Sequence, residues 1–235
     1  MSTFILQTEK FSLTERSAVR YACAIDDSLR IAPQVSVVHD LNESPACPVG
    51  TVEFCREWMQ SHYIPIPSPI DYPDCLSQAL GRSVKQAPFA LARLGHWVKP
   101  VQTKAWDAHI KTASTHAGPD DLVWECEPIS KDQWVAEWRV YVLHGQIVGD
   151  GRYDEGLDES ARYDADLVRS WVDIYTVSKT APAGYAMDVA LMSDGQTILV
   201  EVTDGWAIGY YKGTCSAVDY ARLLSARWDE IKMGV

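Results

Sequence analysis

The sequence predicts a mixed fold, of the α+β or α/β class, in two parts. Residues 1–80 alternate short β-branched runs with runs of helical periodicity, which is typical of a small α/β lobe. The segment YIPIPSPI (63–70) cannot be a central strand, because each of its three prolines removes a backbone hydrogen-bond donor. Residues 81–235 contain two hairpin patterns, which indicate antiparallel sheet. We therefore expect an N-terminal lobe (1–80) and a larger domain (81–235).

The N-terminal lobe is expected to begin with a strand and a capped helix. SLTE is a capping-box pattern, in which Ser12 is the N-cap and Glu15 reaches back to it. Residues 63–70 then form an extended connector that leads to the larger domain. The expected elements of the lobe are a strand at 3–7, a helix from Ser12 through Ala24, a strand at 34–39, a helix at 52–59 and a short helical element at 75–80.

The larger domain is expected to be built on two hairpins. One turns at His144-Gly145 and the other around Ser193-Asp194-Gly195. Two strands precede the hairpins. The expected elements are strands at 94–100, 122–129, 133–143, 146–153, 185–192 and 196–202, and helices at 164–175 and 220–228.

Composition excludes several classes of function. A formal net charge of −11 argues against a general binder of nucleic acid or anionic membranes, because phosphate contacts need clustered cations. No apolar run reaches the length of a membrane span, and the first residues lack a signal-peptide pattern. The six cysteines are scattered without a CxxC, which fits reduced thiols in the cytoplasm. P-loop, GxGxxG, HExxH and GxSxG motifs are all absent.

The second hairpin carries acids in otherwise apolar strands. Asp188 lies on one strand and Glu201 near the end of its partner. Buried carboxylates are costly unless they are paired or hold a cation. Strand alternation puts Thr203 on the same face as Glu201, and Mg²⁺ prefers one or two carboxylates with water and phosphate oxygens. Asp188, Glu201 and Thr203 are therefore candidate magnesium ligands; the alternative is that each acid points to solvent.

The first hairpin carries two arginines, and a lysine ends an earlier strand. Arg139 and Arg152 lie on consecutive strands, and we expect them to face each other as an anion site, since guanidinium suits phosphate and carboxylate. The alternative is a pair of surface arginines bonded to acids such as Asp150 or Glu137. Lys99 can reach a phosphate or extend to solvent.

The order of these residues resembles the ATP-grasp superfamily of carboxylate–amine ligases. More narrowly, it is similar to the clade of that superfamily named for two arginines and a lysine, which is common in phages and bacteria. The resemblance covers about residues 82–213 well and the N-terminal part loosely. It rests on this ordered series, with PVGTVEF (48–54) upstream and GWAIGY (205–210) downstream: VKP (98–100), VWECEP (123–128), EWRVYV (137–142), Gly151-Arg152, Asp188 and EVT (201–203).

The resemblance implies a fold and a role for each site residue. A nucleotide would lie between two antiparallel-sheet subdomains, and the resemblance implies that about residues 97–130 form a lid. Two departures stand out. Thr203 replaces the family's asparagine, so either Asp204 helps to hold the metal or one metal site is poor. The loop 101–109 lacks the family's glycines, so Lys104 is expected to compensate. The implied roles are phosphate contacts for Arg82, Lys99 and Lys104, a hinge at adenine and ribose for Glu125, Cys126 and Glu127, phosphate or carboxylate binding for Arg139 and Arg152, and Mg²⁺ ligation for Asp188 and Glu201.

The implied activity is an ATP- and Mg²⁺-dependent ligase that forms an amide through an acyl phosphate. A nucleotide-binding module with weak or no catalysis is the first alternative, and an unrelated α/β protein with solvated charges is the second. The expected partners are small-molecule or peptide carboxylates and amines, without nucleic acid or membrane. A homodimer is left open.

Overall fold

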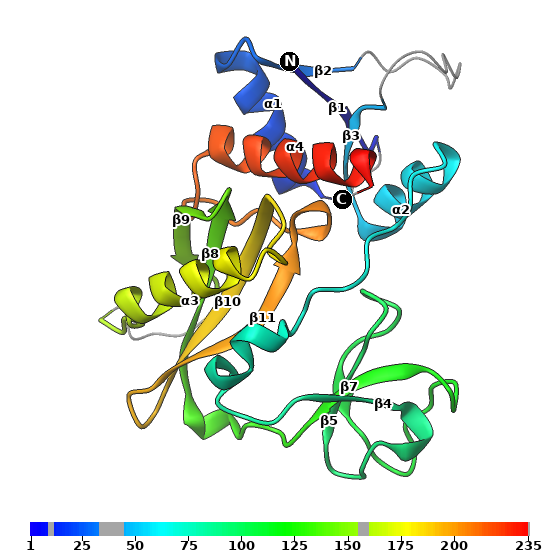
Figure 1. Cartoon of the computed structure of the whole chain (residues 1–235), viewed down its shortest axis with the longest axis vertical. Helices are drawn as coiled ribbons and strands as arrows, with labels where there is room; N and C mark the ends of the chain where they lie inside the picture. Colours follow the sequence, from blue (N-terminus) through cyan, green and yellow to red (C-terminus); the bar gives the residue numbers. More distant parts are fainter. Residues whose placement is uncertain (9–11, 33–44, 155–159, 235) are drawn as a thin grey trace.

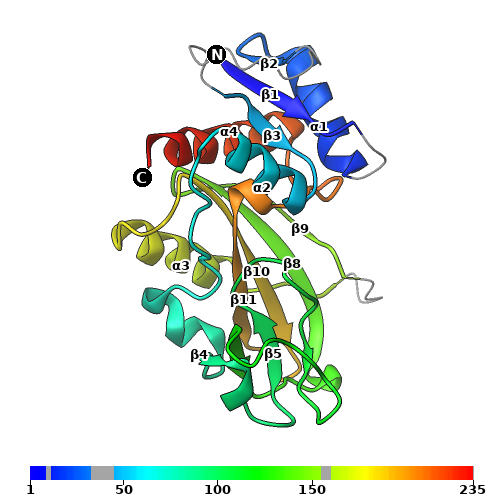
Figure 2. The same ribbon diagram turned by 90° about the vertical axis from the view of Figure 1, so that its right-hand side faces the viewer.

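The computed structural model describes residues 1–8, 12–32, 45–154 and 160–234, and within these ranges the chain forms three sheets. A parallel sheet lies at one end, a long antiparallel sheet in the middle and a small antiparallel sheet at the other end (Figures 1 and 2). The mixed α/β class and the two antiparallel subdomains that the sequence predicts are confirmed.

The N-terminal lobe is a parallel sheet of order β2-β1-β3 with helices beside it. The predicted capping box is wrong: Ser12 adopts left-handed φ and ψ of 51° and 41° and makes no side-chain cap. Glu15 instead accepts a hydrogen bond of 3.1 Å from the backbone N–H of Tyr210. The strand expected at 34–39 lies outside the described residues. The elements of the lobe are β1 (Ser2–Leu6), α1 (Leu13–Ile25), β2 (Leu29–Ile31), β3 (Cys47–Val49) and α2 (Val52–Ser61).

The middle sheet has the order β11-β10-β8-β9 and is antiparallel throughout. Both predicted hairpins are confirmed. His144 and Gly145 have φ of 48° and 71°, as a two-residue turn of matching twist requires. Helix α3 covers one face, and α4 lies between the sheet and the N-terminal lobe (Figure 1). The elements are β8 (Trp134–Leu143), β9 (Gln146–Arg152), α3 (Ala165–Val177), β10 (Gly184–Met192), β11 (Thr197–Asp204) and α4 (Ala217–Met233).

The small sheet has the order β4-β7-β5-β6 and a core of Phe89, Ala92, Val98 and Val123. It already begins at Lys85, twelve residues before the expected start of the lid at about 97. The division of the chain near residue 80 stays a prediction. The elements are β4 (Lys85–Pro88), β5 (Trp97–Pro100), β6 (His109–Ile110) and β7 (Leu122–Cys126), with 3-10 turns at Asp74–Leu80, Phe89–Leu91, Lys131–Gln133 and Gly205–Ala207 (η1 to η4).

The proline-rich connector, which with Asp71 spans residues 63–71, joins the lobe to the sheets and is hydrogen-bonded to the middle one. The backbone N–H of Val202, on β11, donates a hydrogen bond of 2.9 Å to the carbonyl of Asp71. This bond brings the end of the connector to the strand that carries Glu201. Among the described helices, none combines the length and the hydropathy that a membrane crossing needs.

Candidate functional site

A row of charged side chains crosses the face of the middle sheet opposite α3. The ladder pairs Arg139 on β8 with Asp188 on β10, and Asp188 with Glu201 on β11. Paired residues point to the same face. Arg139 donates two hydrogen bonds to Asp188, of 2.8 Å to Oδ1 and 2.7 Å to Oδ2, and both side chains are nearly buried. This planar, two-pronged geometry is the strong form of an arginine–carboxylate contact.

The row continues into the small sheet through Lys99. The Nζ of Lys99 lies 2.5 Å from Glu201 Oε2 and also bonds to the carboxylate of Asp71. We call Arg139, Asp188, Glu201, Lys99 and Asp71 the charged row. Its bases and acids come from four strands and the connector, and each acid has a base beside it.

The surrounding charges keep Lys99 protonated. Burial alone would lower the pKa of its amine, but the nearby carboxylates of Glu201 and Asp71 outweigh burial and raise the pKa above its ordinary value. The lysine therefore remains a cation at the junction of the two sheets. Its Nζ lies 5.8 Å from the centre of the Tyr72 ring.

Glu137 and Asp71 are site residues that sequence reasoning missed. Glu137 precedes Arg139 by two positions on β8 and so shares its face. Tyr153 donates its hydroxyl hydrogen bond to Glu137, and burial, with added repulsion from Asp188, raises the pKa of Glu137 to about 7. Strand alternation could have revealed Glu137, which the sequence analysis considered only as a partner for an arginine. Asp71, within an irregular connector, gave no such signal.

Two tyrosines stack beside Arg139. The rings of Tyr153 and Tyr211 have centroids 5.0 Å apart and an interplanar angle of 11°. The Cζ of Arg139 lies 5.5 Å from the centre of the first ring and 5.2 Å from that of the second. Cation–π attraction and the two bonds to Asp188 therefore fix the guanidinium in one position.

Arg152 does not face Arg139 as expected. The ladder pairs Arg139 with Gly151 and Arg152 with Trp138. A β-bulge between Tyr141 and Val142 shifts the register by one residue, and such a shift turns a side chain to the opposite face. Arg152 accordingly lies with its Cζ 5.8 Å from the centre of the Trp138 ring, where it bonds to Asp154.

Asp204 also lies away from the row. It pairs with Tyr185 in the ladder, so it points to the face opposite that of Glu201 and Thr203. There Arg227 of α4 donates hydrogen bonds of 2.8 and 2.9 Å to its two oxygens. The expectation that Asp204 helps Thr203 to hold a metal is contradicted by this position.

The remaining expected nucleotide contacts are scattered. Arg82 donates hydrogen bonds of 3.1 Å to the carbonyls of Leu80 and Val200, the second on β11 next to Glu201. Lys104 is exposed in the loop after β5.

The expected hinge residues divide between the two sides of β7. Glu125 is only 1% exposed and points to the core side of the small sheet, opposite Lys99. Its Oε1 lies 2.9 Å from His96 Nδ1 and accepts from the N–H of Arg93, so its side chain does not form the expected hinge. Cys126 is buried and Glu127 exposed; backbone contacts to a nucleotide at this hinge stay a prediction.

The donor set on the row suits Mg²⁺. In the described part of the chain, no three His, Cys, Asp or Glu side chains gather closely enough to hold a metal by themselves. Magnesium needs fewer, because it takes one or two carboxylates and completes its shell with water and phosphate oxygens. Asp188 and Glu201 are direct neighbours across the ladder, and the hydroxyl-bearing Thr203 shares their face. Arg139 and Lys99 balance the two carboxylates in this structure.

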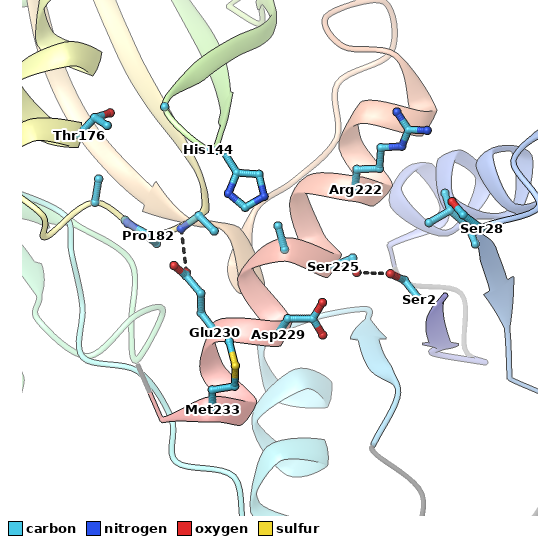
Figure 3. A pocket seen from close by; sticks show the side chains of 15 residues that line it. Ser2, Ser28, His144, Thr176, Pro182, Arg222, Ser225, Asp229, Glu230 and Met233 are labelled. Atoms are coloured by element: carbon cyan, nitrogen blue, oxygen red, sulfur yellow. Dashed lines mark hydrogen bonds between the residues drawn. The ribbon is translucent and has the colours of Figure 1, made fainter.

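Two hollows flank these elements. One, of about 480 Å³, lies between α2, the connector, the loop after β5 and Trp206. The other, of about 620 Å³, lies between α4, the start of β1 and the His144-Gly145 turn (Figure 3). Polar groups in this second hollow bond to each other or to neighbours, as Ser225 does to Ser2 at 2.5 Å and Glu230 to the N–H of Ala183 at 2.7 Å. None of the expected site residues lines it.

Comparisons with known proteins agree with this architecture. Residues 80–223 match a family model of the ATP-grasp domain, the second family of the clade named for two arginines and a lysine. A search of curated protein sequences finds no match.

Three solved structures share the fold at 12% sequence identity. A RimK-domain ATP-grasp protein from Sphaerobacter thermophilus has a TM-score of 0.57, over 95% of this chain and 100% of that one. D-alanine–D-alanine ligase from Bacillus anthracis, complexed with ATP, has a TM-score of 0.56, over 100% and 99%. The ATP-grasp ligase PsnB, complexed with a minimal precursor, has a TM-score of 0.55, over 97% and 99%.

Proposed function

Because the chain belongs to the ATP-grasp superfamily, in the clade named for two arginines and a lysine, we propose that it is an ATP- and Mg²⁺-dependent carboxylate–amine ligase. The charged row carries this proposal. It brings a lysine from one sheet, an arginine from the other and two adjacent carboxylates to the junction between the sheets. Complexes of similar ligases with ATP, or with Mg and ADP, support the choice of nucleotide and metal.

The proposed reaction has two steps. An oxygen of the substrate carboxylate bonds to the γ-phosphorus of ATP, and the bond from that phosphorus to the bridging oxygen breaks, which gives an acyl phosphate and ADP. An amine nitrogen then bonds to the acyl carbon, and the carbon–oxygen bond breaks with its electron pair on the leaving phosphate. The amine proton passes to phosphate or water. Both steps need stabilised phosphate charge and little covalent help from the protein.

The residues of the row divide this work. Lys99 would contact the nucleotide phosphates from the small sheet, and Arg139 would bind the transferred phosphate or the substrate carboxylate. Asp188 and Glu201, with the hydroxyl of Thr203, would hold Mg²⁺, which neutralises phosphate oxygens when bound. The small sheet would cover the reacting atoms and keep water from the acyl phosphate.

Two features favour a second candidate, a nucleotide-binding module with weak or no catalysis. Thr203 offers a poorer metal ligand than the family's asparagine, and the loop 101–109 has no glycine whose backbone could wrap the phosphates. Both features reduce the contacts to the metal and the phosphates on which phosphoryl transfer depends.

An assay of ADP release with pooled amino acids and peptides separates the two candidates. We expect turnover in the wild type, loss in Glu201→Ala and retention in Asp173→Ala, a matched loss of an exposed acid on α3. Thermal stabilisation by ATP and Mg²⁺ without any turnover would favour the binding module. If ATP and Mg²⁺ neither bind nor stabilise the wild type, both candidates are wrong.

A further inference from the structure

The hollow of about 480 Å³ is lined by neighbours in the chain of the charged row, although none of the five residues of the row lines it. Three segments supply both. The connector gives Pro69 to the hollow two residues before Asp71, and β5 gives Pro100 directly after Lys99. The segment after β11 gives Trp206, five residues after Glu201. The same three segments therefore hold both the lining of the hollow and residues of the charged row.

The walls of the hollow are mainly apolar. Its volume is in the range of small-molecule sites, and two tryptophan side chains provide large flat surfaces for a hydrophobic or aromatic group. The apolar lining residues are Ile66, Pro67, Pro69, Pro100, Val101, Ala105, Trp106, Leu122 and Trp206.

A single arginine gives this apolar hollow a cationic wall. Arg56, half-buried on α2, donates one hydrogen bond to the carbonyl of Thr103, and its Cζ lies 6.0 Å from the centre of the Trp206 ring. Among the described residues, no carboxylate forms an ion pair with it. A guanidinium has five N–H donors, so Arg56 keeps a free edge that suits a ligand carboxylate.

Acidic residues lie elsewhere on the lining. Asp120 and Asp121, both exposed, precede β7. Their negative charge disfavours a ligand with a second carboxylate, because like charges repel across a partly dry site.

We propose that this hollow binds an α-amino acid with a bulky apolar side chain as the amine substrate of the ligase. Its side chain lies against Trp106 and Trp206, and its carboxylate is held by Arg56. A carboxylate tied to Arg56 is not the one that becomes phosphorylated, so the amino acid presents its amine to the acyl phosphate. The inference rests on the proposed function and adds the class of acceptor to it.

Calorimetric titration in the presence of a non-hydrolysable ATP analogue and Mg²⁺ tests this site. Phenylalanine and leucine should bind at least about tenfold more tightly than alanine or aspartate, because only they fill the apolar hollow. Phenylalaninamide, which lacks the carboxylate, should bind the wild type about tenfold more weakly than phenylalanine. Arg56→Gln should weaken phenylalanine by a similar factor and leave phenylalaninamide unchanged.

The controls distinguish a ligand contact from a structural one. Arg20→Gln removes the same charge from the exposed side of α1 and should change neither affinity. If Arg56→Gln weakens phenylalanine and phenylalaninamide equally, Arg56 only supports the loop at Thr103 and the inference is wrong. Equal binding of alanine and phenylalanine also overturns it. If the ATP analogue binds but none of the tested amino acids binds, this inference alone is wrong. If the ATP analogue itself does not bind, the proposed function is wrong.

Discussion

Two arginine–aspartate pairs occupy opposite faces of the β10–β11 hairpin. Arg139 holds Asp188 with hydrogen bonds of 2.8 and 2.7 Å, and Arg227 holds Asp204 with bonds of 2.8 and 2.9 Å. All four side chains are under 10% exposed. By geometry alone the two pairs are equivalent.

Their surroundings differ. Asp204 lies between α4 and the sheet, where its oxygens are shared between Arg227 and the N–H of Trp206, so the pair is closed. Asp188 has a second carboxylate, Glu201, directly across the ladder, and Lys99 beyond it. Like charges placed together in a partly buried site are costly and mark a place for a cation. Arg227 also bonds to Glu230, so on that face a base lies between the two acids, whereas Asp188 and Glu201 are paired directly across the ladder. This direct pairing of two carboxylates, rather than the ion pair, distinguishes the face of the charged row.

The largest expected effect tests this distinction by turnover. Asp188→Asn should lower kcat at least about 10³-fold, because charge stabilisation by a bound metal contributes several kcal/mol. Asp204→Asn should keep kcat within about tenfold of the wild type, since Asp204 lies away from the charged row and bonds only to structural partners. ADP release at a temperature where both variants are folded measures the contrast. A comparable loss in both variants would mean that the two faces do not differ in function.

The second effect tests the difference between the two arginine–aspartate pairs by their contributions to stability. Asp204→Asn should cost about 3 kcal/mol in the free energy of unfolding, because the buried Arg227 loses the carboxylate that takes two of its hydrogen bonds and keeps only Glu230. Asp188→Asn should cost less, because it also removes repulsion with Glu201. Urea unfolding at about pH 7.5, where free carboxylates are ionised, gives both values. A larger loss for Asp188→Asn than for Asp204→Asn would contradict the assignment.

The third effect is a pH dependence of the unfolding free energy, caused by Glu137 on the same face of the sheet as Arg139. Burial raises the pKa of Glu137 to about 7. Between about pH 4.5 and 7 the unfolded chain ionises this carboxyl while the folded protein keeps it protonated, so its contribution to stability falls as pH rises, by roughly 1–3 kcal/mol. Glu137→Gln should lack this decline, whereas Glu57→Gln, an exposed control on α2, should keep it. Parallel unfolding curves for wild type and Glu137→Gln would disprove the assignment.

The smallest effect concerns the packing that holds Arg139. A Cβ at Gly151 would overlap Thr214 Cγ2 and lie 2.7 Å from Thr214 Cβ, so Gly151→Ala forces a shift of Thr214, close in the chain to Tyr211, whose ring packs beside the guanidinium. We expect a loss of about 1–2 kcal/mol in unfolding free energy. Adding Thr214→Ser removes that methyl group and keeps the hydroxyl that bonds to Tyr211. The double variant should recover part of the stability, because the Cβ of residue 214 still lies 2.7 Å from the added methyl group. No recovery would mean that the strain lies elsewhere.

Regular strands made much of this site predictable. The hairpins, the pairing of the acid-bearing strands and the shared face of Glu201 and Thr203 follow from turn chemistry and a two-residue period. The same period could have separated Asp204 from Glu201. The position of Arg152 was harder to predict from the sequence. One bulged residue turns its side chain to the opposite face, and a bulge leaves no clear sign in the sequence. The role of Asp71 could not be predicted, because it follows a proline-rich segment without periodicity.

The connector limits how far the chain can be shortened from its N-terminal side without the loss of site residues. The family match begins at residue 80, but Asp71, which bonds to Lys99 and to β11, precedes it, as does Arg56. A fragment of residues 80–235 would keep every residue of the family match and expose the side of β11 that the connector covers. In this fragment Glu201 would be the only acid of the charged row that bonds to Lys99. The charged row therefore extends beyond the part of the chain that the family model matches.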